Sequence, residues 1–403
     1  METINLYKVL LALSSAIDLA EDSMNYENTN DAKHRYQNHS RRTGYVAVSI
    51  AKQLKKRNSF LEKVYVASII HDIGITEDVT SSHWDDEFIS QHSIKGYELA
   101  KRLPIHEDIP EIIRYHHENF DGSGSFDLKG EDIPLISQII RLADTFEIYY
   151  DEARPNYVQR KGIIERIHKN ANVIFSPELV DIFMKIQSKD FFWWDIENIG
   201  SIPAIMNKIK PNLIKRVSME DIKNIALVFS DIIDSRSPFT YKHSVNLTNM
   251  ITEIGKKIGM EHNKLIRFEI AALLHDIGKL AVPSSILNKD GPLTDIERAI
   301  MNSHTYYTRI ILSQIDGFED ITDWASNHHE KLNGIGYPIG LEGKDLGVEE
   351  RIIAVCDIYD ALISDRPYKK GLSKEKSLSI ISDMVKRNEL CGEALKLLEE
   401  IVQ

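Results

Sequence analysis

Cysteines and long apolar runs are both scarce in this sequence, and each scarcity excludes a class of protein. Only Cys356 and Cys391 occur among the 403 residues, so no disulfide framework is available and a reducing compartment is favoured. No stretch approaches the roughly 18 consecutive apolar residues that a membrane-spanning helix requires. The apolar run 9–13 is short and lacks a basic flank, so we expect no secretory signal peptide. These observations predict a cytoplasmic protein without a membrane partner.

Clustered positive charge is missing as well. Lysine and arginine number 49 against 61 aspartates and glutamates, which gives a formal net charge of −12. Proteins that bind duplex nucleic acid through its phosphates usually carry a basic stripe, and none is visible here. We therefore expect no duplex nucleic acid partner. A small anionic ligand is compatible with this charge, because bound metal cations would reverse the local potential.

Alternating β-branched residues, which are typical of strands, are also rare, and helical patterns take their place. The apolar runs 60–70 and 266–274 suit helices that end at a His-Asp pair, and residues 352–363 suit a further helix. Gly74 and Gly278 mark the turns that follow. The chain is too long for one ordinary hydrophobic core. We predict an all-α protein with two domains.

An internal repeat indicates how the two domains divide the chain. The interval from His39 to His71 is 32 positions, and the same interval recurs in the second half. The repeated segments are His39-Ser40 and His243-Ser244, His71-Asp72-Ile73-Gly74 and His275-Asp276-Ile277-Gly278, and His116-His117-Glu118 and His328-His329-Glu330. Such self-similarity indicates two copies of one domain in tandem. We place the first copy at 1–205 and the second at 206–403, with the junction near Pro203–Pro211.

The second copy carries five histidines and two aspartates that could bind metal. These candidate ligands are His243, His275, Asp276, His304, His328, His329 and Asp357. Imidazole and carboxylate together suit iron, manganese, zinc or nickel rather than calcium or magnesium. Asp276 directly follows His275, so the two side chains leave a helix about 100° apart and can reach neighbouring points. Since a carboxylate has two oxygens, Asp276 can bridge two metal ions.

A pair of metal ions at such a site predicts phosphoester chemistry. Two ions about 3.5–4 Å apart can hold a hydroxide and clamp a phosphodiester for in-line attack. Lys279 follows one turn after His275 and could neutralise phosphate charge in the transition state, although a lysine there could also be a solvated helix cap. Arg366 could form paired hydrogen bonds with a phosphate or a guanine edge.

With these residues in view, the second copy resembles the HD-GYP family, a branch of the HD phosphohydrolase superfamily. The matching segments are Pro238-Phe239-Thr240, His243-Ser244, 275–279, His304, His328-His329-Glu330, 333–338, 357–362 and 365–368. The resemblance implies an all-helical HD-type fold that hydrolyses cyclic di-GMP at a site of two or three metal ions, usually iron or manganese. Some members of this family prefer 3′3′-cyclic GMP-AMP.

The resemblance also implies a role for each candidate residue of the second copy. One metal ion would be held by His243, His275, Asp276 and Asp357, and the other by Asp276, His304, His328 and His329. Lys279 and Arg366 would contact a phosphate or base of the substrate. Tyr337 and Pro338 would shape the loop beside it. The family often has a glutamate nine positions before the first histidine, where this chain has Asp234, so a third metal stays an open question.

The first copy resembles the same family more loosely. It keeps every candidate ligand, namely His39, His71, Asp72, His92, His116, His117 and Asp144. Ile75 stands where the second copy has Lys279. Ser125-Phe126 stands where it has Tyr337-Pro338. We therefore expect a partly degenerate HD domain that has lost part of its substrate machinery. A second metal site and a metal-free relic both stay open, as does a regulatory, dimerising or pseudo-enzyme role.

These patterns predict a metal-dependent phosphodiesterase that uses metal-bound hydroxide to open cyclic di-GMP or 3′3′-cyclic GMP-AMP to a linear dinucleotide. The expected cofactors are two transition-metal ions in the second copy, iron or manganese first, with nickel and zinc as alternatives. Two other functions stay open. One is a sensor that binds a cyclic dinucleotide without turnover, and the other is an HD phosphohydrolase acting on another nucleotide. The preference between guanine and adenine and a homodimeric state are open as well.

Overall fold

The computed structural model of the chain describes residues 3–28, 38–75, 86–210, 215–236, 242–364 and 370–402. The chain folds into two compact units. Of the described residues, the N-terminal unit comprises those of 5–75 and 86–215, and the C-terminal unit comprises those of 216–402 with residues 3 and 4. The predicted all-α fold is confirmed, because helices account for nearly all the regular structure of the described residues.

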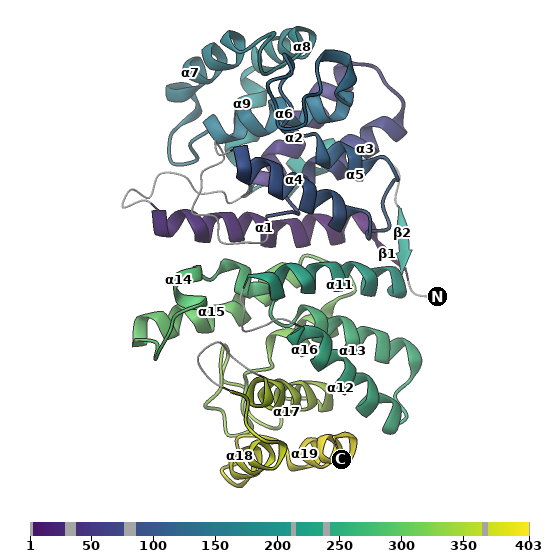
Figure 1. Ribbon diagram of the computed structural model, residues 1–403, viewed down its shortest axis with the longest axis vertical. Helices are drawn as coiled ribbons and strands as arrows, with labels where there is room; N and C mark the ends of the chain where they lie inside the picture. The colour runs from purple at the N-terminus through teal and green to yellow at the C-terminus, as the bar shows by residue number, and fades with distance from the viewer. Residues whose placement is uncertain are drawn as a thin grey trace. The chain divides into compact units, whose positions relative to one another are not determined.

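The N-terminal unit is a packed set of helices (Figure 1). Its elements are α1 (Leu6–Asn28), α2 (His39–Gln53), α3 (Asn58–Ile69), α4 (Asp86–Ala100), α5 (Ile109–Arg114), the 3-10 helix η1 (Gly130–Asp132), α6 (Leu135–Tyr149), α7 (Asn156–Lys169), α8 (Pro177–Gln187), α9 (Asp190–Asn198) and α10 (Pro203–Ile209). Helix α2 is central, since it packs against α1, α3, α6, α8 and α10. The first candidate ligand, His39, begins this central helix.

The C-terminal unit repeats this scheme. Its elements are β2 (Arg216–Ser218), α11 (Met219–Ser235), α12 (His243–Lys257), α13 (His262–Leu274), the 3-10 helix η2 (Ile277–Ala281), α14 (Ser284–Leu287), α15 (Asp295–Leu312), α16 (Glu319–Ser326), α17 (Val348–Ile363), α18 (Lys374–Lys386) and α19 (Gly392–Ile401). Strand β2 pairs with β1 (Thr3–Asn5) in a two-stranded sheet. Helix α13 packs against α11, α12 and α16, and α17 packs against α12.

The helices before the His-Asp pairs end where the sequence pattern predicts. Helix α3 ends at Ile69 and α13 ends at Leu274, each just before its His-Asp pair. In α13 the Glu261 side chain accepts a hydrogen bond from the backbone N–H of Lys264 at 3.1 Å, which caps the first turn. Helix α15 starts with a capping box, in which Thr294 and Glu297 each accept from the other's backbone N–H.

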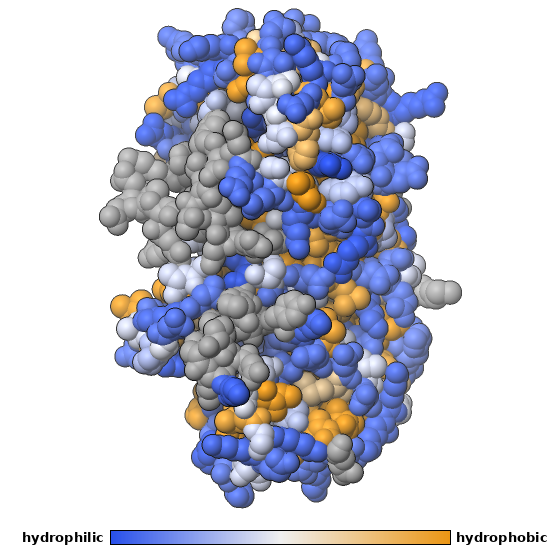
Figure 2. All heavy atoms as spheres, in the orientation of Figure 1, coloured by the Kyte–Doolittle hydropathy of each residue, from blue (hydrophilic) through white to orange (hydrophobic). Residues whose placement is uncertain are grey.

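Apolar side chains gather inside each unit. In α13, Phe268 is fully buried and meets Trp324 of α16 edge-on, with ring centroids 5.7 Å apart. Figure 2 shows that the visible face carries mainly hydrophilic residues, with the apolar ones in small separate groups. Among the described residues, no helix combines the length and the apolar character needed to cross a membrane.

The segment expected at the junction between the two copies forms a helix. Residues Pro203–Ile209 are α10, which buries Ile205, Met206 and Ile209 and packs against α2. The division into compact units therefore falls after this helix, between Lys215 and Arg216. The limits of the two functional domains, 1–205 and 206–403, stay a prediction.

Candidate functional site

The seven candidate ligands of the C-terminal unit come from separate helices and meet in one place. They are His243 at the start of α12, His275 and Asp276 after α13, His304 in α15, His328 and His329 after α16, and Asp357 in α17. Their donor atoms form two groups, each within 4.8 Å: His243, His275 and Asp276, and His304, His328 and His329. Asp357 joins the first group, because its Oδ1 lies 3.2 Å from His243 Nε2.

Asp276 lies between the two groups, with one carboxylate oxygen facing each. Its Oδ2 is 3.1 Å from His275 Nε2, and its Oδ1 is 3.5 Å from His304 Nε2. Oδ1 is buried and has no hydrogen-bond partner among the described residues. Burying an unsatisfied carboxylate oxygen costs free energy unless a cation or a donor reaches it. The mixed imidazole and carboxylate donors therefore fit a pair of transition-metal ions that share Asp276.

A glycine brings the two groups together. A Cβ atom on Gly278 would lie 1.9 Å from the carbonyl oxygen of His304 and 2.6 Å from the backbone nitrogen of Thr308. Only glycine allows η2 to approach α15 this closely. Thr308 completes the contact, because its hydroxyl accepts from the Gly278 N–H and donates to the carbonyl of His275. The N-terminal unit repeats the device, with Gly74 against the carbonyl of His92.

Backbone carbonyls set the tautomers of three of the candidate ligand histidines. The Nδ1 atoms of His275, His304 and His328 lie 2.7 to 2.8 Å from the carbonyl oxygen of the residue three positions earlier. A carbonyl can only accept, so each Nδ1 donates its proton and each Nε2 keeps a lone pair. All three Nε2 atoms face the clusters. This is the arrangement that metal-ligating histidines need.

His243 is held differently, between two carboxylates. Its Nδ1 lies 2.7 Å from Asp360 Oδ2, and its Nε2 lies 3.2 Å from Asp357 Oδ1. Burial by itself would lower the pKa of His243, but hydrogen bonds to these two carboxylates outweigh it and raise that pKa to about 10. The imidazole of the metal-free chain is therefore protonated at neutral pH. A metal ion must displace the Nε2 proton in order to bind.

The second group of histidines is electrically opposite. Burial lowers the pKa of His304 to about 3, and burial also lowers the pKa values of His328 and His329. These imidazoles are neutral at pH 7, which is the form that coordinates metal. The two groups thus differ in how readily a cation enters, since only the His243 side must first release a proton.

Lys279 contacts the shared carboxylate in the absence of metal. Its Nζ lies 2.5 Å from Asp276 Oδ2, and 21% of its side chain is exposed. Although burial opposes ionisation of Asp276, the neighbouring His275 and Lys279 hold the pKa of its carboxyl well below the usual range. Lys279 is therefore a cation at the edge of the cluster, with a partly exposed side chain. The other predicted substrate cation, Arg366, lies outside the described residues.

The predicted Tyr337-Pro338 loop lies beside the second group. The Tyr337 ring sits 4.9 Å from the His329 ring, centroid to centroid, with 40° between the planes. Pro338 follows through a cis peptide bond. The buried Glu330 carboxylate holds this loop, because it accepts from the backbone N–H groups of 339–341 at 2.7 to 3.1 Å. The Glu330 carboxylate thereby fixes the Tyr337-Pro338 loop next to the candidate ligand histidines.

Asp234, at the position of the family's additional glutamate, contacts the start of α12. Its carboxylate accepts from the Ser244 hydroxyl at 3.0 Å and from the Ser244 N–H at 3.3 Å. Burial raises its pKa to about 6. Asp18 holds Ser40 in the same way in the N-terminal unit. The shared contact indicates a role in orienting the helix that presents the first histidine, and the question of a third metal stays open.

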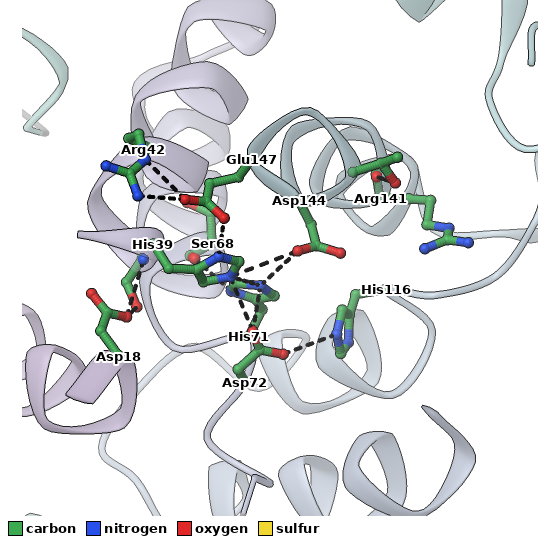
Figure 3. A network of polar contacts seen from close by, with 12 residues as sticks. Asp18, His39, Arg42, Ser68, His71, Asp72, His116, Arg141, Asp144 and Glu147 are labelled. Atoms are coloured by element: carbon green, nitrogen blue, oxygen red, sulfur yellow. Dashed lines mark hydrogen bonds and ion pairs between the residues drawn. The ribbon is translucent and has the colours of Figure 1, made fainter. Parts of the chain in front are cut away.

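The N-terminal unit assembles its own candidate ligands into two groups. They are His39, His71, Asp72 and Asp144, and Asp72, His92, His116 and His117. Asp72 belongs to both, and Figure 3 shows it between His71 and His116. Its Oδ2 is 2.9 Å from His71 Nε2, and its Oδ1 is 3.5 Å from His116 Nε2. Asp72 therefore corresponds to Asp276.

The two centres differ in their access to solvent. All seven N-terminal candidates are buried, and His117 exposes only 4% of its side chain. The corresponding His329 of the C-terminal unit exposes 26%. The C-terminal centre is therefore the more open of the two. A substrate phosphate would need such access to reach the candidate ligands.

Comparison with known proteins places this geometry in a family. A model of the HD domain matches residues 23–174 and 227–390. The chain is 30% identical over 330 residues to 3′3′-cGAMP-specific phosphodiesterase 3 of Vibrio cholerae, covering 81% of this chain and 70% of that protein. The chain belongs to the HD domain family. The resemblance drawn from the motifs is thereby confirmed.

Two further comparisons concern this HD domain protein as a whole. It is 28% identical over 356 residues to 3′3′-cGAMP-specific phosphodiesterase 1 of Vibrio cholerae, covering 85% of this chain and 82% of that protein. A crystal structure described as a cyclic GMP-AMP specific phosphodiesterase of V. cholerae matches with a TM-score of 0.71 and 22% identity. That match covers 100% of this chain and 98% of the other, and it concerns the fold.

Sequence reasoning missed the residues that support the HD ligands. Asp360 accepts from His243, and Glu147 holds Nδ1 of His39 at 2.7 Å in the N-terminal unit. A signal was available, since each acid lies three positions after the last ligand aspartate and so shares its helix face. The role of Glu330 was also missed, although the repeated His-His-Glu segment contains it.

Proposed function

We propose that the C-terminal unit is a phosphodiesterase that opens a cyclic dinucleotide to a linear dinucleotide. The observation that carries this proposal is the placement of Asp276, whose two oxygens face two separate groups of imidazoles. A carboxylate shared in this way suits a two-metal site for phosphodiester hydrolysis. Two relatives that align with most of the chain are named 3′3′-cGAMP-specific phosphodiesterases, which supports the same reaction class here.

The residues that would hold the two ions follow from the groups of donor atoms. One ion would be held by His243, His275, Asp276 and Asp357, and the other by Asp276, His304, His328 and His329. The mixed nitrogen and oxygen donors favour iron or manganese, with nickel and zinc also compatible. When bound, such ions supply positive charge to a phosphodiester and acidify a water molecule, so that a nucleophile forms near neutral pH.

The remaining residues would bind and orient the substrate. Lys279 would exchange its contact with Asp276 for a phosphate oxygen once metal neutralises that carboxylate, because its side chain lies beside the cluster and is partly exposed. Tyr337 would place its ring beside a base or ribose, since it already packs on the His329 ring. From the sequence alone we add Arg366 as a substrate contact and Pro338 as a shaping residue of the loop.

The substrate class is a cyclic dinucleotide, and the names of the relatives favour 3′3′-cyclic GMP-AMP over cyclic di-GMP. The sequence-based domain limits assign this activity to 206–403 and leave 1–205 as a partly degenerate, regulatory HD domain. We also propose a cytoplasmic location, where such signalling nucleotides are found. Homodimer formation is a further expectation from the sequence.

The test is turnover by the full chain. Protein purified anaerobically is reloaded with Fe(II) or Mn(II) and incubated with 3′3′-cyclic GMP-AMP and cyclic di-GMP in parallel. Linear dinucleotide, detected by chromatography with mass detection and lost in Asp276→Ala, is the expected result. Binding of either nucleotide without turnover at full metal loading would favour a sensor. Neither binding nor turnover would favour an HD phosphohydrolase that acts on another nucleotide.

A further inference from the structure

One buried arginine distinguishes the N-terminal centre from the C-terminal one. Arg141 lies on α6, one helical turn before the ligand Asp144. The corresponding position on α17, one turn before Asp357, is Ala354. Arg141 exposes only 9% of its surface, so its guanidinium lies inside the unit (Figure 3). A buried guanidinium keeps its charge and must be directed at acceptors.

Arg141 directs one N–H group at the second group of candidate ligands and another at a neighbouring amide. Nη1 lies 3.2 Å from Nδ1 of His117, and Nη2 donates to Asn119 Oδ1 at 3.0 Å. Arginine has only donors, so Nδ1 of His117 must accept and cannot carry the proton. A neutral imidazole carries one proton, which therefore sits on Nε2. That Nε2 faces His92 Nε2 at 3.0 Å, which is the side where a metal ion would bind.

This tautomer removes His117 from the set of metal ligands. An imidazole nitrogen that carries a proton has no lone pair for a metal ion. The permanent charge of Arg141 also opposes a second divalent cation a few ångströms away, in a region with little water to screen it. The two histidines are otherwise placed alike, since Nδ1 of His117 lies 3.9 Å from Asp144 Oδ2 and Nδ1 of His329 lies 3.9 Å from Asp357 Oδ2. The difference is that α17 has Ala354 at the position of Arg141.

The other group of the N-terminal centre shows none of these obstacles. Glu147 accepts from Nδ1 of His39, and the carbonyl of Ser68 accepts from Nδ1 of His71, so both Nε2 atoms face Asp72. The distances among these Nε2 atoms and the oxygens of Asp72 and Asp144 run from 2.9 to 3.7 Å. Ligands each about 2.1 Å from one ion lie about 3.0–3.4 Å apart, so the spacing fits a single cation.

We propose that the N-terminal unit binds one metal ion, held by His39, His71, Asp72 and Asp144, and that Arg141 takes the place of the second. Four of the seven candidate positions of this repeat then form a mononuclear site. A two-metal clamp on a phosphodiester cannot form there, and the ion serves structure or sensing. This inference concerns the first repeat alone and holds whether or not the C-terminal unit has the proposed activity.

The experiment counts the ions of the first repeat within the full chain. The C-terminal ligands are removed by the double substitution Asp276→Ala and His304→Ala, so that bound metal reports on the N-terminal unit. Protein is loaded anaerobically with Mn(II), freed of excess metal and measured by elemental mass spectrometry. Electron paramagnetic resonance adds a second readout, because an isolated Mn(II) ion and a coupled pair give different spectra. Circular dichroism checks folding of each variant.

We expect one ion per chain in this background and two after Arg141→Ala, which copies Ala354. Arg141→Met, which keeps the side-chain volume but removes the donors, should also give two. Arg57→Ala, at an exposed position of the same unit, should leave one, and Asp72→Ala should leave none. Two ions before Arg141 is changed, no ion at all, or one ion in folded forms of both Arg141 variants would overturn the proposal.

Discussion

The Glu330 carboxylate offers the sharpest test of how the loop 337–341 of the C-terminal unit is held. Its Oε1 accepts from the N–H groups of Ile339 and Gly340, and its Oε2 accepts from those of Gly340 and Leu341. In Glu330→Gln, the amide oxygen still accepts hydrogen bonds from some of these backbone N–H groups, but the bonds are no longer to a charged acceptor. The amide NH2 group then opposes one backbone N–H, donor against donor.

The size of the effect follows from these contacts. A hydrogen bond to a charged group contributes about 1.5–3 kcal/mol and a neutral one about 1 kcal/mol. Losing one such bond and weakening the others should reduce the stability of the ordered loop by about 2–4 kcal/mol, since the chain relaxes in part. That corresponds to a factor of about 30 to 1,000 in the equilibrium between ordered and open loop. Because the loop carries Tyr337, we expect kcat/KM for the cyclic dinucleotide to fall at least about tenfold.

Two assays check this reasoning separately. Hydrogen exchange of the 339–341 amides should become faster in Glu330→Gln, and metal content should stay unchanged. The matched control is Glu118→Gln, because Glu118 accepts from the N–H groups of Phe126 and Leu128 in the first repeat. It should loosen its own loop while turnover changes much less. Faster exchange in Glu330→Gln with unaltered kcat/KM would refute a role of this loop in substrate handling, and unaltered exchange would refute the hydrogen-bond argument itself.

Four further outcomes follow from the C-terminal centre. Gly278→Ala forces a Cβ into the carbonyl of His304, so the free energy of unfolding should fall by about 3 kcal/mol and the metal content should fall as well. A melting curve like that of the unchanged protein would contradict this. Lys279→Met should lower kcat by about 100- to 1,000-fold with metal retained, as for other lost charge-stabilising donors, and equal kcat would remove Lys279 from the mechanism. Asp360→Asn should weaken metal binding by about 10- to 100-fold in competition titrations, because it supports His243. The pKa of His243 is raised to about 10, so its proton competes with metal below that pH, and metal affinity should rise by up to about tenfold per pH unit between pH 7 and 10; affinity independent of pH would show that no such proton is displaced.

The sequence alone was sufficient for the fold class, and it named the seven candidate ligands that the structure brings together in each unit. The repeated His-Asp segments follow apolar runs, and the structure places them just after α3 and α13 as this pattern indicates. Helical spacing is a local property, so a residue pattern can reveal it without knowledge of the tertiary fold. The tautomers of His275, His304 and His328 are local in the same sense, because each depends on a carbonyl three residues earlier.

The tertiary structure decided which atoms face one another across the fold. Asp360 lies 117 positions from His243, and Arg141 lies 24 positions from His117, and neither contact has a periodicity that a single sequence reveals. Both repeats keep the same seven ligand types, so the motif alone could not separate a one-ion site from a two-ion site. The difference comes from one arginine, whose donors fix the proton of a ligand imidazole once folding buries the two side chains together.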